Sequence, residues 1–154
     1  MYGLISDKHL KDIAIAVCDC LGHGANTNAV DLLLETAGAE TGRGQVKDYS
    51  VYAGMGITQI DELPFKDIKD RCRSSDKALI MHHLDIDIDL VEWTHLRYNP
   101  LLSLIFTRLK YKKVPEMIPL TVEGRSEYWK EHYNSTEGKG TLAHYIDANT
   151  TYTA

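Results

Sequence analysis

The sequence lacks the two features that would tie the protein to a membrane or to export. It contains no run of 18 apolar residues, about the length that a transmembrane helix requires. It also does not open with a basic segment followed by an apolar one, as a secretory signal peptide does. We therefore expect no stable membrane insertion and no export signal of its own. If the protein acts beyond a membrane, something else must deliver it.

Cysteine is scarce, and the three cysteines have no framework spacing. An odd number of thiols without such spacing suits a reducing cytosol better than a disulfide-built secreted domain. Cys18 and Cys20 fall on a predicted helix with their side chains rotated apart. We expect both to be buried as small hydrophobic residues.

An excess of positive charge is absent as well, because 17 Lys and Arg face 22 Asp and Glu, a net charge of -5. Proteins that hold nucleic acid by charge need clustered cations, so no nucleic-acid partner is expected. The motif "LKYKK" (residues 109–113) is a local basic patch. It is either a contact for an anionic cell wall or another protein, or the solvated end of a helix.

Metal-binding spacing is missing too. Two adjacent histidines and three aspartates occur together in "MHHLDIDID": His82, His83, Asp85, Asp87 and Asp89. Adjacent histidines on a helix point about 100° apart, and no spacing here matches a zinc or calcium site. We expect a solvated, polar turn with no metal and no other cofactor.

What the sequence does contain is the length and apolar content of one globular domain, residues 1–154. Apolar periodicity and capping residues predict a mainly α fold. The expected helices span 7–21, 28–40, two or more pieces within 64–98 (beginning near Pro64 and Ser75), a buried central helix at 100–111, and closing helices at 121–133 and 141–149. Residues 42–60 are rich in Gly and Tyr and predict irregular chain or a short hairpin. "LDIDIDL" alternates like a strand, although its neighbours favour helix.

Glu40 occupies a position where an apolar residue is expected. In "LLLETAGAETGRG" (residues 32–44), a helix would align Leu33, Ala37 and Glu40 on one face, and that face must turn to the core. Desolvation and the negative end of the helix dipole both favour the protonated acid and raise its pKa. Such a glutamic acid suits general-acid chemistry on a glycosidic oxygen. The structural alternative is a glutamate that bends out to water.

Glu35 lies five residues earlier on the same predicted helix. At about 100° per residue it is rotated roughly 140° away from Glu40. We therefore expect Glu35 to be a solvated surface charge.

Two later motifs extend this interpretation: "GMGITQI", centred on Gly56, and then "HYNSTEGKG". The order of "AETG", "GMGITQI" and "HYN" resembles soluble lytic transglycosylases and goose-type lysozymes, where a helix-ending "ESG" precedes "GLMQI" and "YNAG". The wider chain is similar to small bacteriophage proteins of this class. The resemblance covers residues 29 to 149 and implies an α+β lysozyme-like fold, with the irregular or hairpin segment beside an active-site cleft.

The resemblance also implies roles for individual residues. Glu40 matches the catalytic glutamate, and Tyr133 matches the tyrosine that approaches and orients its carboxyl. The substrate-binding residues are then expected to be Thr41, Gly56, Thr58, Gln59 and Asn134. The chain departs from the family in one extra residue before the glutamine and in "NSTEGKG" replacing "NAG". These departures leave the sugar-contacting atoms open, but not the location of the cleft.

The implied reaction is cleavage of the β-1,4 bond between N-acetylmuramic acid and N-acetylglucosamine in peptidoglycan. Glycosidases usually need a second carboxylate, and Asp48 and Asp61 are the candidates. Because neither stands out, the sequence favours a lytic transglycosylase with one carboxylate over a hydrolytic muramidase. Three tyrosines are candidate platforms for sugar rings, or else core residues with a bonded hydroxyl: Tyr49, Tyr52 and Tyr111.

The resemblance to phage proteins implies an origin in a bacteriophage or prophage. The protein would wait in the cytoplasm of the infected host for release through a holin, as an endolysin does, or travel within the virion beside other virion proteins. In both cases it would act in the periplasm or cell wall. The alternative from another class is a non-catalytic virion structural protein that keeps the scaffold.

Overall fold

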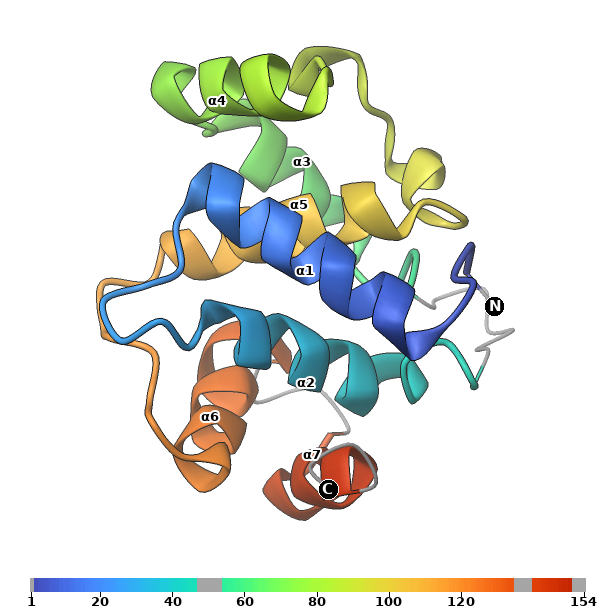
Figure 1. The fold of residues 1–154 in the computed structure, drawn as a ribbon, viewed down its shortest axis with the longest axis vertical. Coiled ribbons are helices and arrows are strands. Elements are labelled where there is room, and N and C mark those ends of the chain that lie inside the picture. The colour runs from blue at the N-terminus through green and yellow to red at the C-terminus, as the bar shows by residue number, and fades with distance from the viewer. Residues whose placement is uncertain (1, 47–53, 135–139, 151–154) are drawn as a thin grey trace.

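Helices make up most of the described chain (Figure 1). The structure is a computed structural model that describes residues 2–46, 54–134 and 140–150. In chain order the elements are α1 (Asp7–Leu21), α2 (Ala29–Thr41), α3 (Glu62–Asp70), α4 (Ser74–Leu84), η1 (Ile88–Leu90), η2 (Trp93–Leu96), α5 (Pro100–Lys112), α6 (Val122–Trp129), η3 (Lys130–Asn134) and α7 (Leu142–Thr150). The prediction of a mainly α fold is confirmed.

The helices surround a central pair formed by α1 and α5 (Figure 1). Helices α3 and α4 lie on one side of this pair, with α4 packed on α1 and α3 on α5. Helix α2 lies on the other side, where α6 and α7 cover it. Helix α2 therefore has neighbours on two of its faces, and this arrangement determines how far its two glutamates, Glu35 and Glu40, are buried.

The ends of the helices follow the capping signals in the sequence. The Ser6 hydroxyl accepts a hydrogen bond from the His9 amide at the start of α1, and Gly22 ends that helix. At α5, Pro100 occupies the first turn and the Asn99 side chain accepts from the Leu102 amide at 3.1 Å. The predicted positions of both helices are confirmed.

Helix α5 is buried almost all round, as the sequence predicted. Every residue from 102 to 109 is buried, including the side chains of Ser103, Thr107 and Arg108. The buried hydroxyls stay bonded because Ser103 donates to the Leu96 carbonyl and Thr107 to the Ser103 carbonyl. This helix lies at the centre of the hydrophobic core.

The segment around "LDIDIDL" forms no strand, so that alternative is wrong. Asp85 ends α4 in the left-handed conformation (φ 55°), and the Asp87 side chain accepts from the Asp89 amide, which starts a 3-10 turn. The preceding helices begin at Glu62 and Ser74, close to the predicted starts. The segment is thus held by a local hydrogen bond from its own chain and not by hydrogen bonds to a neighbouring strand.

Several expectations about single residues can be compared with the fold. Cys18 and Cys20 are buried and unpaired, as predicted, while Cys72 is partly exposed. His82 and His83 are exposed. Within the described ranges, no group of three or more potential ligand side chains could hold a metal ion. Among the same residues, no helix is long and apolar enough to cross a membrane.

Candidate functional site

Glu40 lies in the last turn of α2, where Gly42 ends the helix in the left-handed conformation with φ 56°. Its side chain is partly exposed, and most of its surroundings are made of protein. This burial raises the pKa of Glu40 to about 8. The nearby positive charge of Lys110 lowers that pKa, the negative charge of Asp61 raises it, and the Trp129 indole lowers it. The desolvated acid predicted at this position is thus present.

Trp129 contributes a donor without a partner of good geometry. Its indole Nε1 is buried and makes no hydrogen bond within the described residues, although it approaches the Glu40 carboxyl closely enough to lower its pKa. A buried N–H without a partner is costly, and such groups are few in native proteins. The site therefore holds a buried indole donor beside Glu40.

Thr41, next to Glu40, ties the end of α2 to the segment that follows. Its hydroxyl lies 2.7 Å from the Ile57 carbonyl and 3.2 Å from the Ala37 carbonyl, and it accepts from the Gly44 amide at 3.0 Å. With 1% of its surface exposed, Thr41 has no free group for a substrate. Its role here is to hold the 54–61 segment against the helix end, rather than to bind sugar.

Residues 54–61 form a tight turn instead of a hairpin of full strands. Met55 and Ile60 exchange backbone hydrogen bonds of 2.8 and 3.1 Å in one antiparallel bridge. Gly56 has φ 80°, and a Cβ there would collide with the Ser103 hydroxyl and the Leu96 carbonyl. Gln59 is also left-handed (φ 51°), and its side-chain amide donates to the Gly56 carbonyl at 2.9 Å.

Tyr133 lies in η3 and is hydrogen-bonded to the turn formed by residues 54–61. Its hydroxyl donates to the Thr58 carbonyl at 2.7 Å, and the hydroxyls of Thr58 and Thr107 are hydrogen-bonded to each other at 2.8 Å. Thr58 is fully buried, so its hydroxyl is not available to a substrate. Burial, and next the charge of Glu40, raise the pKa of Tyr133, which keeps it a neutral donor.

Lys110 lies over this group of side chains. Its ammonium is 4.3 Å from the centre of the Tyr133 ring and donates to the Tyr133 carbonyl at 3.2 Å. Burial lowers the pKa of Lys110, while Asp61 and Glu40 raise it. The cation thus lies within the electrostatic reach of both carboxylates.

The π-helical turn η3 continues α6 and carries the "YN" pair. The Asn134 side-chain oxygen accepts from Lys130 at 3.0 Å, and Asn134 remains partly exposed. A Cβ on Gly140 would collide with the Trp129 ring and approach Asn134. Gly140 therefore packs beside Asn134, although more residues separate the two than in the family motif "NAG".

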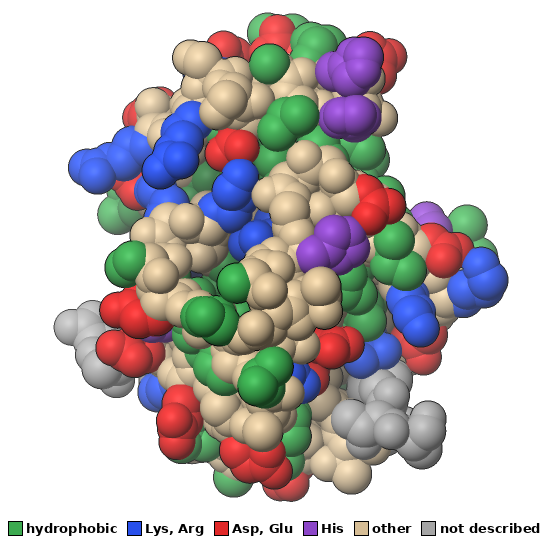
Figure 2. All heavy atoms as spheres, turned by 60° about the vertical axis from the view of Figure 1, so that its left-hand side comes forward, with side chains coloured by type: hydrophobic (Ala, Val, Ile, Leu, Met, Phe, Trp, Pro, Cys, Tyr) green, Lys and Arg blue, Asp and Glu red, His purple; other side chains and the backbone are tan. Residues whose placement is uncertain are grey.

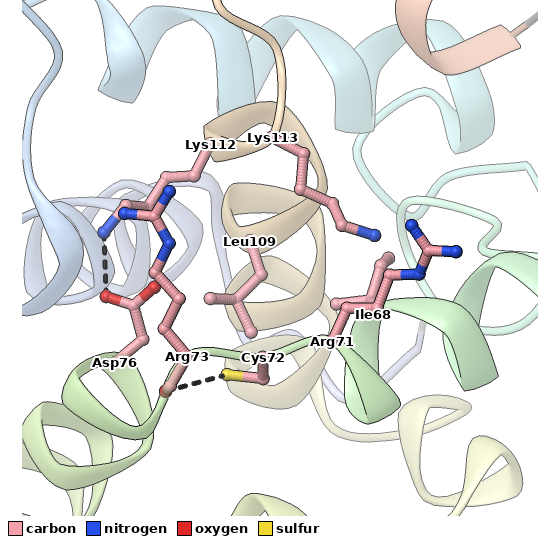
Figure 3. A pocket seen from close by; sticks show the side chains of 8 residues that line it. All are labelled: Ile68, Arg71, Cys72, Arg73, Asp76, Leu109, Lys112 and Lys113. Atoms are coloured by element: carbon pink, nitrogen blue, oxygen red, sulfur yellow. Dashed lines mark hydrogen bonds and ion pairs between the residues drawn. The ribbon is translucent and has the colours of Figure 1, made fainter.

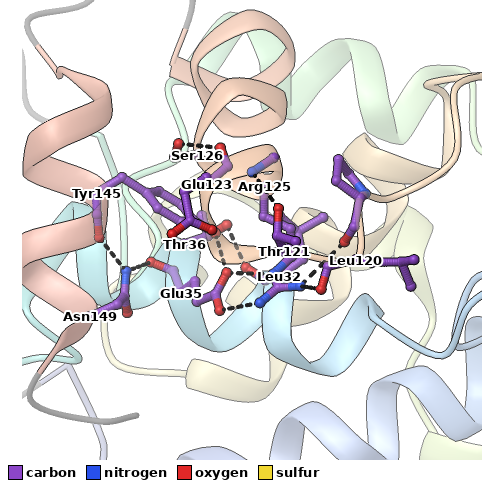
Figure 4. Close-up of polar contacts among 12 residues, drawn as sticks. Leu32, Glu35, Thr36, Leu120, Thr121, Glu123, Arg125, Ser126, Tyr145 and Asn149 are labelled. Carbon is purple, nitrogen blue, oxygen red and sulfur yellow. Dashed lines mark hydrogen bonds and ion pairs between the residues drawn. The ribbon is translucent and has the colours of Figure 1, made fainter.

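The expectation for Glu35 is wrong. Glu35 is buried, and its carboxylate accepts two hydrogen bonds from Arg125, at 2.7 and 2.9 Å, and one from Tyr145 at 2.8 Å (Figure 4). Asn149 donates to the Glu35 carbonyl. Helices α6 and α7 cover the face of α2 that points away from α1. Glu35 is rotated by about 140° from Glu40 around the helix, and this rotation places it on that covered face instead of at the surface.

Tyr111 is not a sugar platform, because it is 1% exposed and its hydroxyl bonds to Thr36 at 2.9 Å. Tyr49, Tyr52 and Asp48 lie outside the described residues. Asp61 is exposed and lies near enough to Glu40 to raise its pKa.

Two site residues, Lys110 and Trp129, were not anticipated. Trp129 could have been found, because it precedes Tyr133 by four residues and so shares its helix face. For Lys110 the signal was weaker, because the sequence showed it only as one lysine of the basic patch "LKYKK".

Together these groups make one acid that can release and regain a proton near neutral pH. Its pKa of about 8 keeps the Glu40 carboxyl protonated at pH 7, and the cation of Lys110 stabilises the carboxylate left after proton transfer. The Gly54–Asp61 turn and Tyr133 hold its surroundings in place. Comparison with protein-family models, curated proteins and solved structures finds no match to this chain.

Proposed function

We propose that the protein cleaves the β-1,4 bond between N-acetylmuramic acid and N-acetylglucosamine in peptidoglycan, with Glu40 as general acid and base. The observation that carries the proposal is the raised pKa of Glu40, about 8, beside Lys110 and Asp61. The hydrogen bonds from Thr41 and Tyr133 to the 54–61 turn support the proposal, because they join the three motifs that carry the resemblance.

The first step is donation of the Glu40 proton to the glycosidic oxygen while the bond to the muramic C1 breaks. The N-acetyl carbonyl oxygen of the muramic residue attacks C1 from the opposite face. Lys110 stabilises the Glu40 carboxylate that results, since its charge favours the ionised form. Tyr133 remains neutral and orients the surrounding backbone through Thr58.

In the second step the Glu40 carboxylate takes the proton of the muramic C6 hydroxyl. The C6 oxygen then bonds to C1 and displaces the N-acetyl oxygen, which gives a 1,6-anhydro sugar without consuming water. One carboxyl group therefore serves both steps and ends the cycle protonated. This is lytic transglycosylation, and it needs no second acid.

Hydrolysis by a muramidase is the second candidate, and the location of Asp61 favours it. Asp61 is exposed at the end of the 54–61 turn and interacts electrostatically with Glu40. If Asp61 activates a water, the product is a reducing sugar and not an anhydro sugar. We further propose that the protein acts in the cell wall during phage entry or lysis, a role that rests on the resemblance.

The test of catalysis compares the wild type with Glu40→Gln on purified peptidoglycan by zymography and turbidity. We expect the rate to fall by about 10²–10⁴-fold, as loss of a general acid does. Glu127→Gln, an exposed glutamate of α6, is the matched control and should retain full activity. Equal clearing by Glu40→Gln and wild type would overturn the assignment. No clearing by a folded wild type would favour a non-catalytic structural role.

Mass spectrometry of the released fragments decides between the two reactions. Transglycosylation predicts fragments lighter by one water than the reducing products of hydrolysis. Asp61→Asn should leave the yield of anhydro products unchanged, whereas a hydrolase would lose activity through this change. Reducing ends that disappear in Asp61→Asn would establish the muramidase alternative.

A further inference from the structure

A small basic cavity lies between α3, α4 and the end of α5 (Figure 3). Its volume is about 70 Å³, several times the room that one water needs. Eight residues line it: Ile68, Arg71, Cys72, Arg73, Asp76, Leu109, Lys112 and Lys113. None of them belongs to the Glu40 site.

The lining carries a strong local charge. Four cations and one carboxylate give the lining a net charge of +3, in a chain whose net charge is -5. In Figure 2, Lys and Arg side chains gather on the upper part of one face. The "LKYKK" motif supplies part of this charge through Lys112 and Lys113. A concentration of cations against the overall sign of the chain favours an anionic ligand.

The cations approach the cavity from two sides. In Figure 3, Arg73 and Lys112 lie on one side and Arg71 and Lys113 on the other, with Leu109 between them. An anion in this space would present oxygens to both pairs. Arginine recognises phosphate oxygens with paired N–H groups, and lysine adds a point charge.

Two aspartates only partly neutralise these cations. Asp76 binds Lys112 at 2.8 Å, and Asp67, outside the lining, binds Arg71 at 2.8 Å and Lys113 at 2.6 Å. Counting Asp67 with the lining still leaves a charge of +2. Arg73 forms no ion pair within the described residues.

The start of α4 adds a weaker attraction for an anion. Arg73 is the N-cap residue, and its side chain makes no capping hydrogen bond, so the first amides of α4 lack a side-chain acceptor. A helix N-terminus carries partial positive charge that favours anions. This effect supplements the four side chains.

We propose that this cavity is a binding site for a phosphate group, presented by a small soluble phosphate or by a phospholipid headgroup. The volume suits a tetrahedral oxyanion. A doubly charged phosphate would interact with both cation pairs, whereas a singly charged carboxylate would satisfy one.

Cys72 is a built-in reporter for this site. Its thiol lines the cavity and is partly exposed, whereas Cys18 and Cys20 are buried. An occupied cavity should slow alkylation of Cys72 by the neutral reagent iodoacetamide. Labelling of Cys18 and Cys20, measured in the same digest by mass spectrometry, reports any unfolding.

The test measures Cys72 alkylation in inorganic phosphate and in chloride at equal ionic strength. Phosphate at about ten times its dissociation constant should slow labelling about tenfold. The double variant Arg73→Gln/Lys113→Gln, which removes one cation from each side, should lose this protection. Lys66→Gln on α3 is the matched control, because Lys66 pairs with Glu62 outside the cavity.

Two further arms identify the source of the phosphate. Protection by glycerol phosphate and not by phosphatidic acid vesicles indicates a soluble ligand, and the reverse indicates a lipid surface. Either result supports the site. The proposal is overturned if no phosphate probe protects the wild type, or if the double variant is protected as well as Lys66→Gln.

Discussion

At the scale of single residues, Glu40 and Lys110 are each driven by burial toward their neutral forms. Burial raises the pKa of Glu40 and lowers that of Lys110, while their mutual attraction acts in the opposite direction on both. The balance leaves the Glu40 pKa at about 8. A general acid of this kind loses its proton, and so its activity, as the pH rises through that value.

Lys110→Gln is expected to raise the pKa of Glu40, because it removes the positive charge that stabilises the carboxylate. We expect a shift of about one unit, the order of magnitude of the effect of a nearby opposite charge. Carbon-13 NMR titration of the Glu40 carboxyl measures it directly, and the alkaline limb of peptidoglycan cleavage should move upward with it. Lys8→Gln, an exposed change on α1, should leave the titration unchanged. An unchanged or lower Glu40 pKa in Lys110→Gln would refute the coupling.

Gly56→Ala should be markedly more destabilising than Gly42→Ala, although both glycines have positive φ. At Gly42 a Cβ would meet only ordinary contacts, whereas at Gly56 it would collide with Ser103 and the Leu96 carbonyl. We expect about 1 kcal/mol of lost stability at Gly42 and about 3 kcal/mol at Gly56. Urea denaturation of the two variants measures the difference, and equal losses would contradict the close packing of the turn.

At the scale of elements, the buried group around Glu35 fastens three helices together. Glu35 lies on α2, Arg125 on α6, and Tyr145 with Asn149 on α7. Arg125 also donates to the carbonyls of the 119–120 connector. These contacts lie on the face of α2 that carries no site residue, so we assign them to stability.

Removal of one partner should cost more than removal of both. Glu35→Ala leaves the Arg125 charge buried and unpaired, and should lower the free energy of unfolding by about 3–5 kcal/mol. The double change Glu35→Leu/Arg125→Met should cost less than this. Glu127→Ala, an exposed change on α6, should stay within about 0.5 kcal/mol of wild type. Chemical denaturation measures all three, and a double variant that loses as much stability as Glu35→Ala, or more, would contradict this prediction.

The elements predicted well are those that local chemistry determines. Ser6, Gly22 and Pro100 fix helix ends through their own hydrogen bonds and backbone preferences. The apolar periodicity likewise identified the face of α2 that carries Glu40. Glu35 was mispredicted because a helix wheel gives the angle between faces but not which faces other helices cover. That coverage depends on α6 and α7, far along the chain.

The candidate site was predictable in part for the same reason. Glu40 and Tyr133 are found through motifs that carry their own spacing. Thr41 and Thr58, expected to bind sugar, are instead buried in contacts with segments distant in sequence. Lys110 and Trp129 reach Glu40 only through tertiary packing, which periodicity cannot supply.

At the scale of the whole molecule, one continuous core joins the two sides of the α1–α5 pair. Trp93 lies in η2 on the α3 side, where its indole donates to the Ile60 carbonyl at 2.8 Å. Trp129 lies in α6, with its ring 5.2 Å from that of Tyr145. The chain contains only these two tryptophans, so fluorescence can follow each side separately.

A single core predicts that both sides unfold together. Trp129→Phe leaves Trp93 as the sole reporter, and Trp93→Phe leaves Trp129. In each variant the urea midpoint from fluorescence should coincide with that from far-UV circular dichroism, even if the two variants differ in stability. Comparison within one variant removes the effect of the substitution itself. A Trp129 transition that precedes the loss of helix would show that α6 and α7 detach first, and would mean that the Glu35 group fastens these helices less tightly than its geometry implies.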